Sequence, residues 1–257
     1  MSEERIVTAA MLAIGDELLS GRTKDKNIGH LADVLTVAAI DLKEVRIVAD
    51  EEAAIVEAVN ALRAKYDYVF TSGGIGPTHD DITADAISVA FGVECLHDED
   101  AMALLGDMYK RRDVPFTEAR QRMARMPAGA RHIANPVSVA PGFNIGNVYV
   151  MAGVPSVFQA MLEGLIPTLA AGTKTISQMV VSPFGEGDIG LPLAEIQKAH
   201  PLTSIGSYPK FDGKRFSTEI VIRSRDEHML SQATAAVDTM LLEVAARKEQ
   251  EKSDNKS

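Results

Sequence analysis

Three glycines and two adjacent acids lie in one short loop, and together these residue types could bind a phosphorylated ligand. Residues 71–83 read Thr-Ser-Gly-Gly-Ile-Gly-Pro-Thr-His-Asp-Asp-Ile-Thr. Glycines let backbone N–H groups approach a phosphate without interference from a Cβ atom. The carboxylates of Asp80 and Asp81 would repel that phosphate unless a divalent cation lay between them. The stretch therefore predicts a site for a phosphorylated ligand and a metal ion.

The context of this loop predicts a strand before it and a helix after it. An apolar run at 66–70 precedes the loop, and apolar residues at helical spacing follow at 84–90. The N-terminal end of such a helix favours an anion. The loop is neither a GxGxxG fingerprint nor a Walker A motif, so a tight turn without a ligand remains an alternative. We expect one of Asp80 and Asp81 to cap the helix and Asp81 to have the functional role.

Apolar runs alternate with amphipathic segments through the first two thirds of the chain. Strands are expected at 6–14, 42–48, 66–70 and 148–151, and helices at 28–38, 55–62, 84–90 and 153–166. Asn27 is expected to cap the first helix. Residues 97–126 read as amphipathic and helical, with an exposed basic cluster at 110–112, and 127–146 read as a long loop. The alternation predicts an α/β fold, a mostly parallel sheet with helices on both faces.

In open parallel sheets, ligand sites form beside the carboxyl ends of the strands. Three segments follow expected strands here: 15–21, the residues around Asp50, and 73–81. They place several acids near one rim of the sheet: Asp16, Glu17, Asp50, Asp80 and Asp81. Asp50 could instead only begin the next helix, and Asp16 and Glu17 could be solvated loop residues.

After Pro167 the pattern changes to a smaller unit. Strands are expected at 175–182, 202–208 and 215–223, with a turn at 212–213, and helices at 189–199 and 229–246. This order is typical of a small α+β domain. We therefore expect a first domain at 1–170, a second at 171–246, and a frayed or disordered charged tail at 247–257.

Composition excludes several classes of partner. The chain has 257 residues, 46% hydrophobic and 24% charged, as in ordinary globular proteins. A net charge of −10 argues against nucleic acid or an anionic membrane as the main partner. The apolar run 6–14 is far shorter than the roughly 20 residues of a membrane helix. A single cysteine, Cys95, and a charged N-terminus unlike a signal peptide lead us to expect a cytoplasmic protein.

Several motifs resemble the molybdopterin-binding-like family. They are Ile14-Gly-Asp-Glu-Leu-Leu-Ser-Gly21, Asp25 with Asn27, and the stretch 71–83. The family includes molybdopterin adenylyltransferases of the Mog/MoaB kind and the N-terminal half of the competence/damage-inducible protein CinA. Gly206-Ser-Tyr-Pro209 resembles the small second domain of the CinA type.

A second resemblance is to the molybdopterin-binding-like domain of FAD synthases. The Gly-Gly-Ile-Gly-Pro-Thr-His-Asp-Asp stretch, Pro141-Gly-Phe143 and Asn147-Val-Tyr149 carry it. In FAD-synthase-type and CinA-type relatives, the domain is linked to metal-dependent cleavage of pyrophosphates such as ADP-ribose or FAD.

The resemblance implies a MoaB/Mog-like fold, a divalent metal (Mg, Mn or Co) and roles for individual residues. Asp50 and Asp81 match the acids that serve the metal and the reaction, and Asp80 would be a further metal ligand. The expected substrate contacts are Gly15, Asp16, Glu17, Asn27, Thr71, Ser72, Gly73, Gly74, Gly76, Pro77 and Thr78.

The leading hypothesis is therefore a metal-dependent nucleotide pyrophosphatase, a hydrolase of an ADP-ribose-like or FAD-like diphosphate. A molybdopterin adenylyltransferase or molybdopterin-binding protein with a pterin ligand is the alternative. Val157 stands where relatives carry an acid, which motivates a third hypothesis, a non-catalytic nucleotide sensor. Because relatives assemble, we also expect a homo-oligomer.

Overall fold

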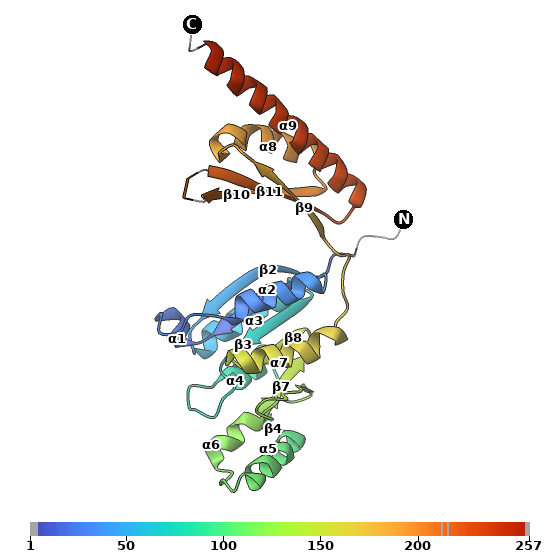
Figure 1. Cartoon of the computed structure of the whole chain (residues 1–257). Coiled ribbons are helices and arrows are strands. Elements are labelled where there is room, and N and C mark those ends of the chain that lie inside the picture. The colour runs from blue at the N-terminus through green and yellow to red at the C-terminus, as the bar shows by residue number, and fades with distance from the viewer. Residues whose placement is uncertain (1–4, 212, 215, 255–257) are drawn as a thin grey trace. The chain divides into compact units, whose positions relative to one another are not determined.

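The computed structural model describes residues 5–211, 213–214 and 216–254 (Figure 1). The chain divides into two compact units, one of residues 5–172 and the other beginning at Thr173. No helix among the described residues combines the length and the apolar character needed to span a bilayer.

The first unit is built on a sheet of six strands in the order β2-β1-β3-β8-β7-β6. Their bounds are β1 Thr8–Ile14, β2 Asp41–Val48, β3 Tyr68–Ser72, β6 Arg131–Ile133, β7 Gly142–Ile145 and β8 Val148–Met151. The first four strands of that order pair in parallel, and β7 runs antiparallel between β8 and β6. The carboxyl ends of β1, β2 and β3 therefore meet at one edge of the sheet.

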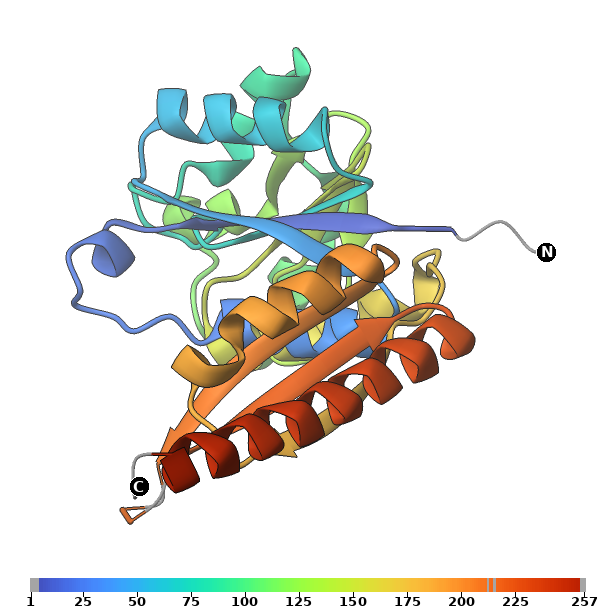
Figure 2. The same cartoon turned by 90° about the horizontal axis from the view of Figure 1, so that it is seen from above.

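Helices cover both faces of this sheet. Their bounds are α1 Asp16–Leu19, α2 Asn27–Val37, α3 Glu52–Arg63, α4 Thr83–Phe91, α5 Glu99–Arg111, α6 Glu118–Gln121 and α7 Pro155–Leu165, with 3₁₀ turns η1 Arg122–Ala124 and η2 Ile166–Thr168. In β1, Leu12 faces the apolar cluster that contains α3 and α4, and its neighbour Met11 faces the cluster of α2 and α7. Figure 2 shows α3 and α2 on opposite sides of β1. The predicted α/β fold is confirmed.

The second unit is a small α+β domain, as expected. It comprises β9 Ile176–Ser182, α8 Glu186–Ala199, β10 Thr203–Phe211, β11 Phe216–Ser224 and α9 Glu227–Asp254. Its strands form an antiparallel sheet in the order β10-β11-β9. Ile220 and Ile222 of β11 pack beneath Ile189 of α8 and Val237 of α9. Residues 212 and 215 of the expected turn and strand lie outside the described residues.

The expectation for residues 97–146 was wrong in two ways. Residues 97–126 do not form one helical segment, because α5 ends at Arg111 and the left-handed Asp113 (φ 54°) turns the chain. Two short strands, β4 Cys95–His97 and β5 Arg125–Pro127, pair on either side of this segment. The expected loop 127–146 contains β6 and β7, whose three and four residues are too short to give an alternating pattern.

The tail expectation was also wrong for residues 247–254, which continue α9. Lys248 Nζ lies 2.7 Å from Asp188 Oδ2 of α8, and Arg247 Nη2 donates to the Asp188 carbonyl at 3.4 Å. These contacts tie α9 to α8 at residues 247 and 248. Residues 255–257 lie outside the described residues.

Candidate functional site

The loops that follow β1 and β2 are joined by two reciprocal hydrogen bonds. The Asp16 N–H donates to Asp50 Oδ2 at 2.9 Å, and the Asp50 N–H donates to Asp16 Oδ1 at 3.4 Å. The Gly15 N–H also donates to the Val48 carbonyl at 3.1 Å. Two acids from different loops are thus held together at the edge where the parallel strands end.

Asp50 lies in an environment that opposes its ionisation. Burial is the largest cause and raises the pKa of its carboxyl, whereas the N–H of Asp16 lowers it. The negative charges of Asp16, Glu17 and Asp80 raise this pKa further. Asp50 does not cap α3, since no side chain makes a capping hydrogen bond at that helix start. The four carboxylates form one negatively charged neighbourhood that a cation would stabilise.

The glycine loop between β3 and α4 requires glycine on steric grounds. Gly73 has φ 111° and Gly74 has φ 67°. A Cβ atom on Gly73 would lie 2.2 Å from the Ile14 carbonyl oxygen, and one on Gly74 would lie 2.0 Å from Thr83 Oγ1. Thr83 closes the loop, because its hydroxyl donates to the Gly73 carbonyl and its N–H to the Gly74 carbonyl, both at 3.0 Å.

The amides of this loop are not equally available to an anion. The Gly73 N–H donates to the Met151 carbonyl at 3.2 Å, so this amide, which we expected to contact phosphate, already has an acceptor within the protein. Within the described chain, the amides of Gly74, Ile75 and Gly76 have no protein acceptor. Three consecutive unpaired N–H groups around a left-handed glycine are the type of backbone arrangement that binds anions.

Asp81 is held in a tight turn at the tip of the loop. Its Oδ2 accepts the Thr78 N–H at 2.8 Å and the Thr78 hydroxyl. Asp80 is more exposed, with 61% of its side chain accessible, and the Thr78 hydroxyl lowers its pKa. The expectation that one of the two acids caps α4 was wrong: the cap position is Ile82, and no side chain caps this helix.

Asn27 joins α2 to the sheet edge instead of capping the helix. The Ile28 N–H donates to Asp25 Oδ2 at 2.9 Å, so Asp25 takes the role that we expected for Asn27. The buried Asn27 Nδ2 donates to Ser72 Oγ at 2.7 Å and to the Gly153 carbonyl at 2.8 Å. The expected cap was wrong because the side chain is turned inward, to residues distant in the sequence.

Two buried polar atoms near the end of β3 have no hydrogen-bond partner among the described residues. They are Asn27 Oδ1 and the hydroxyl of Thr71. Such orphaned groups are uncommon in folded proteins. Of the other expected contacts, Gly15 lies against the Glu17 carboxylate and Gly76 against that of Asp81.

The acids at the rim do not form a ready-made metal cage. No group of three or more His, Cys, Asp or Glu among the described residues is arranged to hold a metal ion. A nucleotide-bound Mg²⁺ needs fewer protein ligands, because one or two carboxylates and the phosphate oxygens suffice. The desolvated Asp50 carboxyl beside Asp16 fits that smaller set.

Arg122 contacts the glycine loop, and the sequence alone did not predict this contact. Its Nη2 donates to the Asp81 carbonyl at 3.1 Å from a position 41 residues away. No local pattern marks this pairing. The basic cluster at 110–112 is exposed at the end of α5, as expected.

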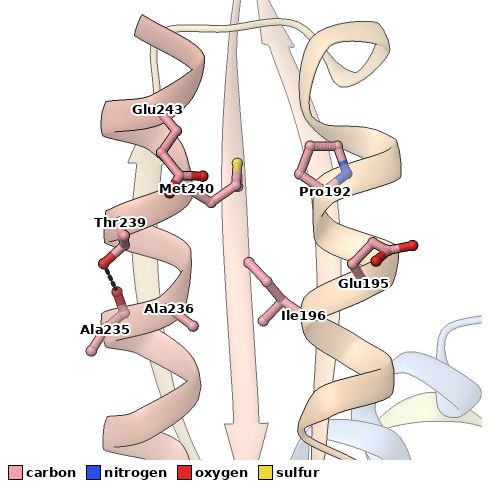
Figure 3. Close-up of a pocket in the computed structure, with 8 residues that line it drawn as sticks. All are labelled: Pro192, Glu195, Ile196, Ala235, Ala236, Thr239, Met240 and Glu243. Atoms are coloured by element: carbon pink, nitrogen blue, oxygen red, sulfur yellow. Dashed lines mark hydrogen bonds between the residues drawn. The ribbon is translucent and has the colours of Figure 1, made fainter. Parts of the chain in front are cut away.

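The second unit has a groove between α8 and α9 with a volume of about 470 Å³ (Figure 3). It is lined by Pro192, Glu195, Ile196, Ala235, Ala236, Thr239, Met240 and Glu243. No basic side chain is among these described lining residues, and two are acids. The groove therefore does not suit a phosphate.

Comparisons with known proteins agree with this two-unit organisation. Residues 10–171 match a family described as "Probable molybdopterin binding domain", and residues 174–250 match one described as "FAD synthase, middle domain". A protein of Pyrobaculum calidifontis is 36% identical over 212 residues, which cover 79% of this chain and 81% of the relative.

Two further relatives carry the name CinA. A CinA-like protein of Syntrophus aciditrophicus is 30% identical over 84% of this chain and 54% of its own length. The crystal structure of CinA from Thermoplasma acidophilum, of unknown function, has a TM-score of 0.59 and 32% identity, covering 63% of this chain and 98% of that one. The chain belongs to the molybdopterin-binding domain family of the MoaB/Mog kind, in a CinA-like form.

Proposed function

We propose that this protein is a metal-dependent nucleotide pyrophosphatase that acts on an ADP-ribose-like or FAD-like diphosphate. The observation that supports this most strongly is the Asp16–Asp50 pair. Two carboxylates are held together at the sheet edge although burial and, to a smaller extent, the negative charge of Asp16 raise the pKa of Asp50. A cation bound with a diphosphate would relieve that repulsion. Acids whose pKa is raised by burial and by neighbouring charges are concentrated at functional sites.

In this mechanism, the backbone of the glycine loop binds the diphosphate. The unpaired amides of Gly74, Ile75 and Gly76 donate to phosphate oxygens. Asp50, Asp80 and Asp81 would hold the metal. The cation, when bound, neutralises phosphate charge and lowers the pKa of water. Either Asp50 or Asp81 would accept the proton that water loses as its oxygen bonds to phosphorus, while the bridging P–O bond breaks and the leaving phosphate keeps the bridging oxygen.

The second unit supports the choice of a dinucleotide-like substrate. Residues 174–250 match the middle domain of FAD synthase, and the FAD named there contains a diphosphate. Members of the family that this chain resembles form oligomers, and we therefore include a homo-oligomer in the proposal. Light scattering after size-exclusion chromatography measures it directly.

A molybdopterin adenylyltransferase or molybdopterin-binding protein is the second candidate, and the description "Probable molybdopterin binding domain" for residues 10–171 favours its pterin ligand. In that case, incubation with ATP and molybdopterin yields an adenylated pterin. A nucleotide sensor without catalysis is the third. Val157, where the resemblance leads us to expect an acid, is 7% exposed and packs in the apolar cluster of α7.

A panel of nucleotides and metals tests the proposal. The purified chain is incubated with ADP-ribose, FAD or NAD and with Mg²⁺, Mn²⁺, Co²⁺ or a chelator, and AMP is measured by chromatography. We expect AMP from ADP-ribose or FAD with at least one metal and none with the chelator. Tight binding without AMP in any combination would favour the sensor.

A further inference from the structure

Few hydrogen bonds join the tip of the glycine loop to the rest of the protein, although Ile75 and Ile82 at its two ends pack against the apolar cluster of α3 and α4. At its base, Thr83 bonds to Gly73 and Gly74, and Gly73 bonds to Met151. Between Ile75 and Ile82, the other hydrogen bonds lie within the tip itself. The Thr78 N–H and hydroxyl donate to Asp81 Oδ2, and the Asp81 N–H donates to the Thr78 carbonyl. In the described part of the chain, Arg122 Nη2 to the Asp81 carbonyl is the side-chain hydrogen bond that links this tip to a distant segment.

The segment that carries Arg122 is itself firmly placed. Ala124 is fully buried, and its carbonyl accepts the Asp98 N–H at 2.9 Å. Arg125 forms a two-pronged ion pair with Asp85 of α4, the helix that follows the loop, with one bond at 2.9 Å. The guanidinium of Arg122 is therefore presented to the loop from a support tied to the core and to α4.

The placement of the Arg122 side chain does not favour folding. Its Nε is buried and has no hydrogen-bond partner among the described residues. An unsatisfied buried donor destabilises a protein, and a core without this requirement would accept an apolar residue here. An unsatisfied buried donor beside an acid of the site calls for an explanation, and a role at the site is one such explanation.

We propose that Arg122 is a positioning residue for Asp81. By holding the Asp81 carbonyl, it fixes the turn from Thr78 and so the direction of the Asp81 carboxylate. This inference rests on the proposed function for its effect on catalysis. Its structural part, the immobilisation of the loop tip, is measurable without any substrate.

The test compares amide hydrogen exchange of residues 75–82 in the wild type, Arg122→Ala and Arg122→Lys. Arg120→Ala is the matched control, because Arg120 donates to the Pro115 carbonyl and lies over Tyr109 within its own segment. We expect Arg122→Ala to raise exchange about tenfold at the Thr78 and Asp81 amides, which are the hydrogen-bonded N–H groups among the described residues 75–82, as loss of a charge-assisted bond predicts. Lysine should restore part of the protection, and Arg120→Ala should leave 75–82 unchanged.

A general structural role predicts a different result. It would raise exchange across the whole first unit and lower the melting temperature, whereas positioning confines the change to the tip. With substrate, Arg122→Ala should lower kcat more than it changes KM. Unchanged exchange in 75–82 would overturn the inference, even if the enzyme is active. A loosened tip in a protein that cleaves no diphosphate would instead refute the proposed function and leave the inference standing.

Discussion

Asn27 Nδ2 lies 2.7 Å from Ser72 Oγ and joins the start of α2 to the end of β3. The same amide donates to the Gly153 carbonyl, 126 residues away. One buried side chain thus connects three segments behind the glycine loop.

Replacing Asn27 by alanine should therefore destabilise the first unit. One buried and one partly buried hydrogen bond are lost, and we expect the free energy of unfolding to fall by about 1–3 kcal/mol. Denaturant unfolding measures this change. Asn144→Ala is the control, because Asn144 also makes two hydrogen bonds but within its own hairpin and closer to solvent. Equal losses in the two variants would contradict the role given to Asn27.

Gly74 and Gly164 should respond to alanine with opposite signs. At Gly74, φ is 67° and the new Cβ would meet Thr83 Oγ1, so we expect a loss of about 1–3 kcal/mol in the free energy of unfolding. Gly164 lies in α7 with open space around it, and alanine there should stabilise by about 0.5–1 kcal/mol. Thermal unfolding of both variants measures whether each substitution raises or lowers stability. A stabilised Gly74→Ala would show that the loop is unstrained.

Asp50→Asn should be more stable than the wild type at neutral pH, although we expect it to be inactive. The folded-state pKa of Asp50 is raised, so the ionised carboxylate destabilises the fold above that pKa. As the pH falls through the raised pKa of the folded state towards the pKa of an unfolded Asp, about 3.9, Asp50 of the wild type gains a proton. The difference in stability between Asp50→Asn and the wild type then disappears. Melting temperatures from pH 4 to 8 measure this window.

Asp67→Asn should change the stability at neutral pH in the opposite direction, and it serves as the control for this pH dependence. The Thr8 hydroxyl and N–H, both 2.7 Å from Asp67 Oδ2, lower the pKa of that carboxyl. The stability from Asp67 is therefore present above the unfolded pKa and is lost as the pH falls through the folded one. Asp67→Asn should be less stable than the wild type at neutral pH. A destabilised Asp50→Asn at that pH would contradict the electrostatic account of the rim.

Asp81→Asn should abolish diphosphate cleavage while the fold survives. We expect a fall in turnover of at least about 100-fold, the usual effect of losing a catalytic acid or base. Circular dichroism checks the fold, and AMP release measures the rate. Asp80 is mostly exposed, so Asp80→Asn should lower the rate less than Asp81→Asn. Wild-type turnover in Asp81→Asn would remove Asp81 from the mechanism.

Sequence patterns predicted the fold because its signals are local. The apolar run of β3, the glycines after it and the spacing in α4 are contiguous, and each follows from residue chemistry. The contacts that complete the site are not local. Arg122 meets Asp81 across 41 residues, and Asn27 meets Gly153 across 126. No periodicity encodes such pairs.

The expected phosphate contacts also depend on pairing between strands that local sequence patterns do not predict. A glycine suggests an accessible amide, but the Gly73 N–H is used by Met151 at the end of the neighbouring strand β8. Only the pairing of β3 with β8 reveals this, and that pairing is a property of the sheet. The short strands β6 and β7 were missed because three or four residues do not establish a pattern.

The most direct test is a crystal of the protein grown with Mn²⁺ and a non-hydrolysable analogue of ADP-ribose. The account predicts an anomalous manganese peak between the Asp50 carboxyl and the diphosphate, with phosphate oxygens on the amides of residues 74–76. A nucleotide bound elsewhere, or a rim without manganese at saturating concentrations, would contradict it.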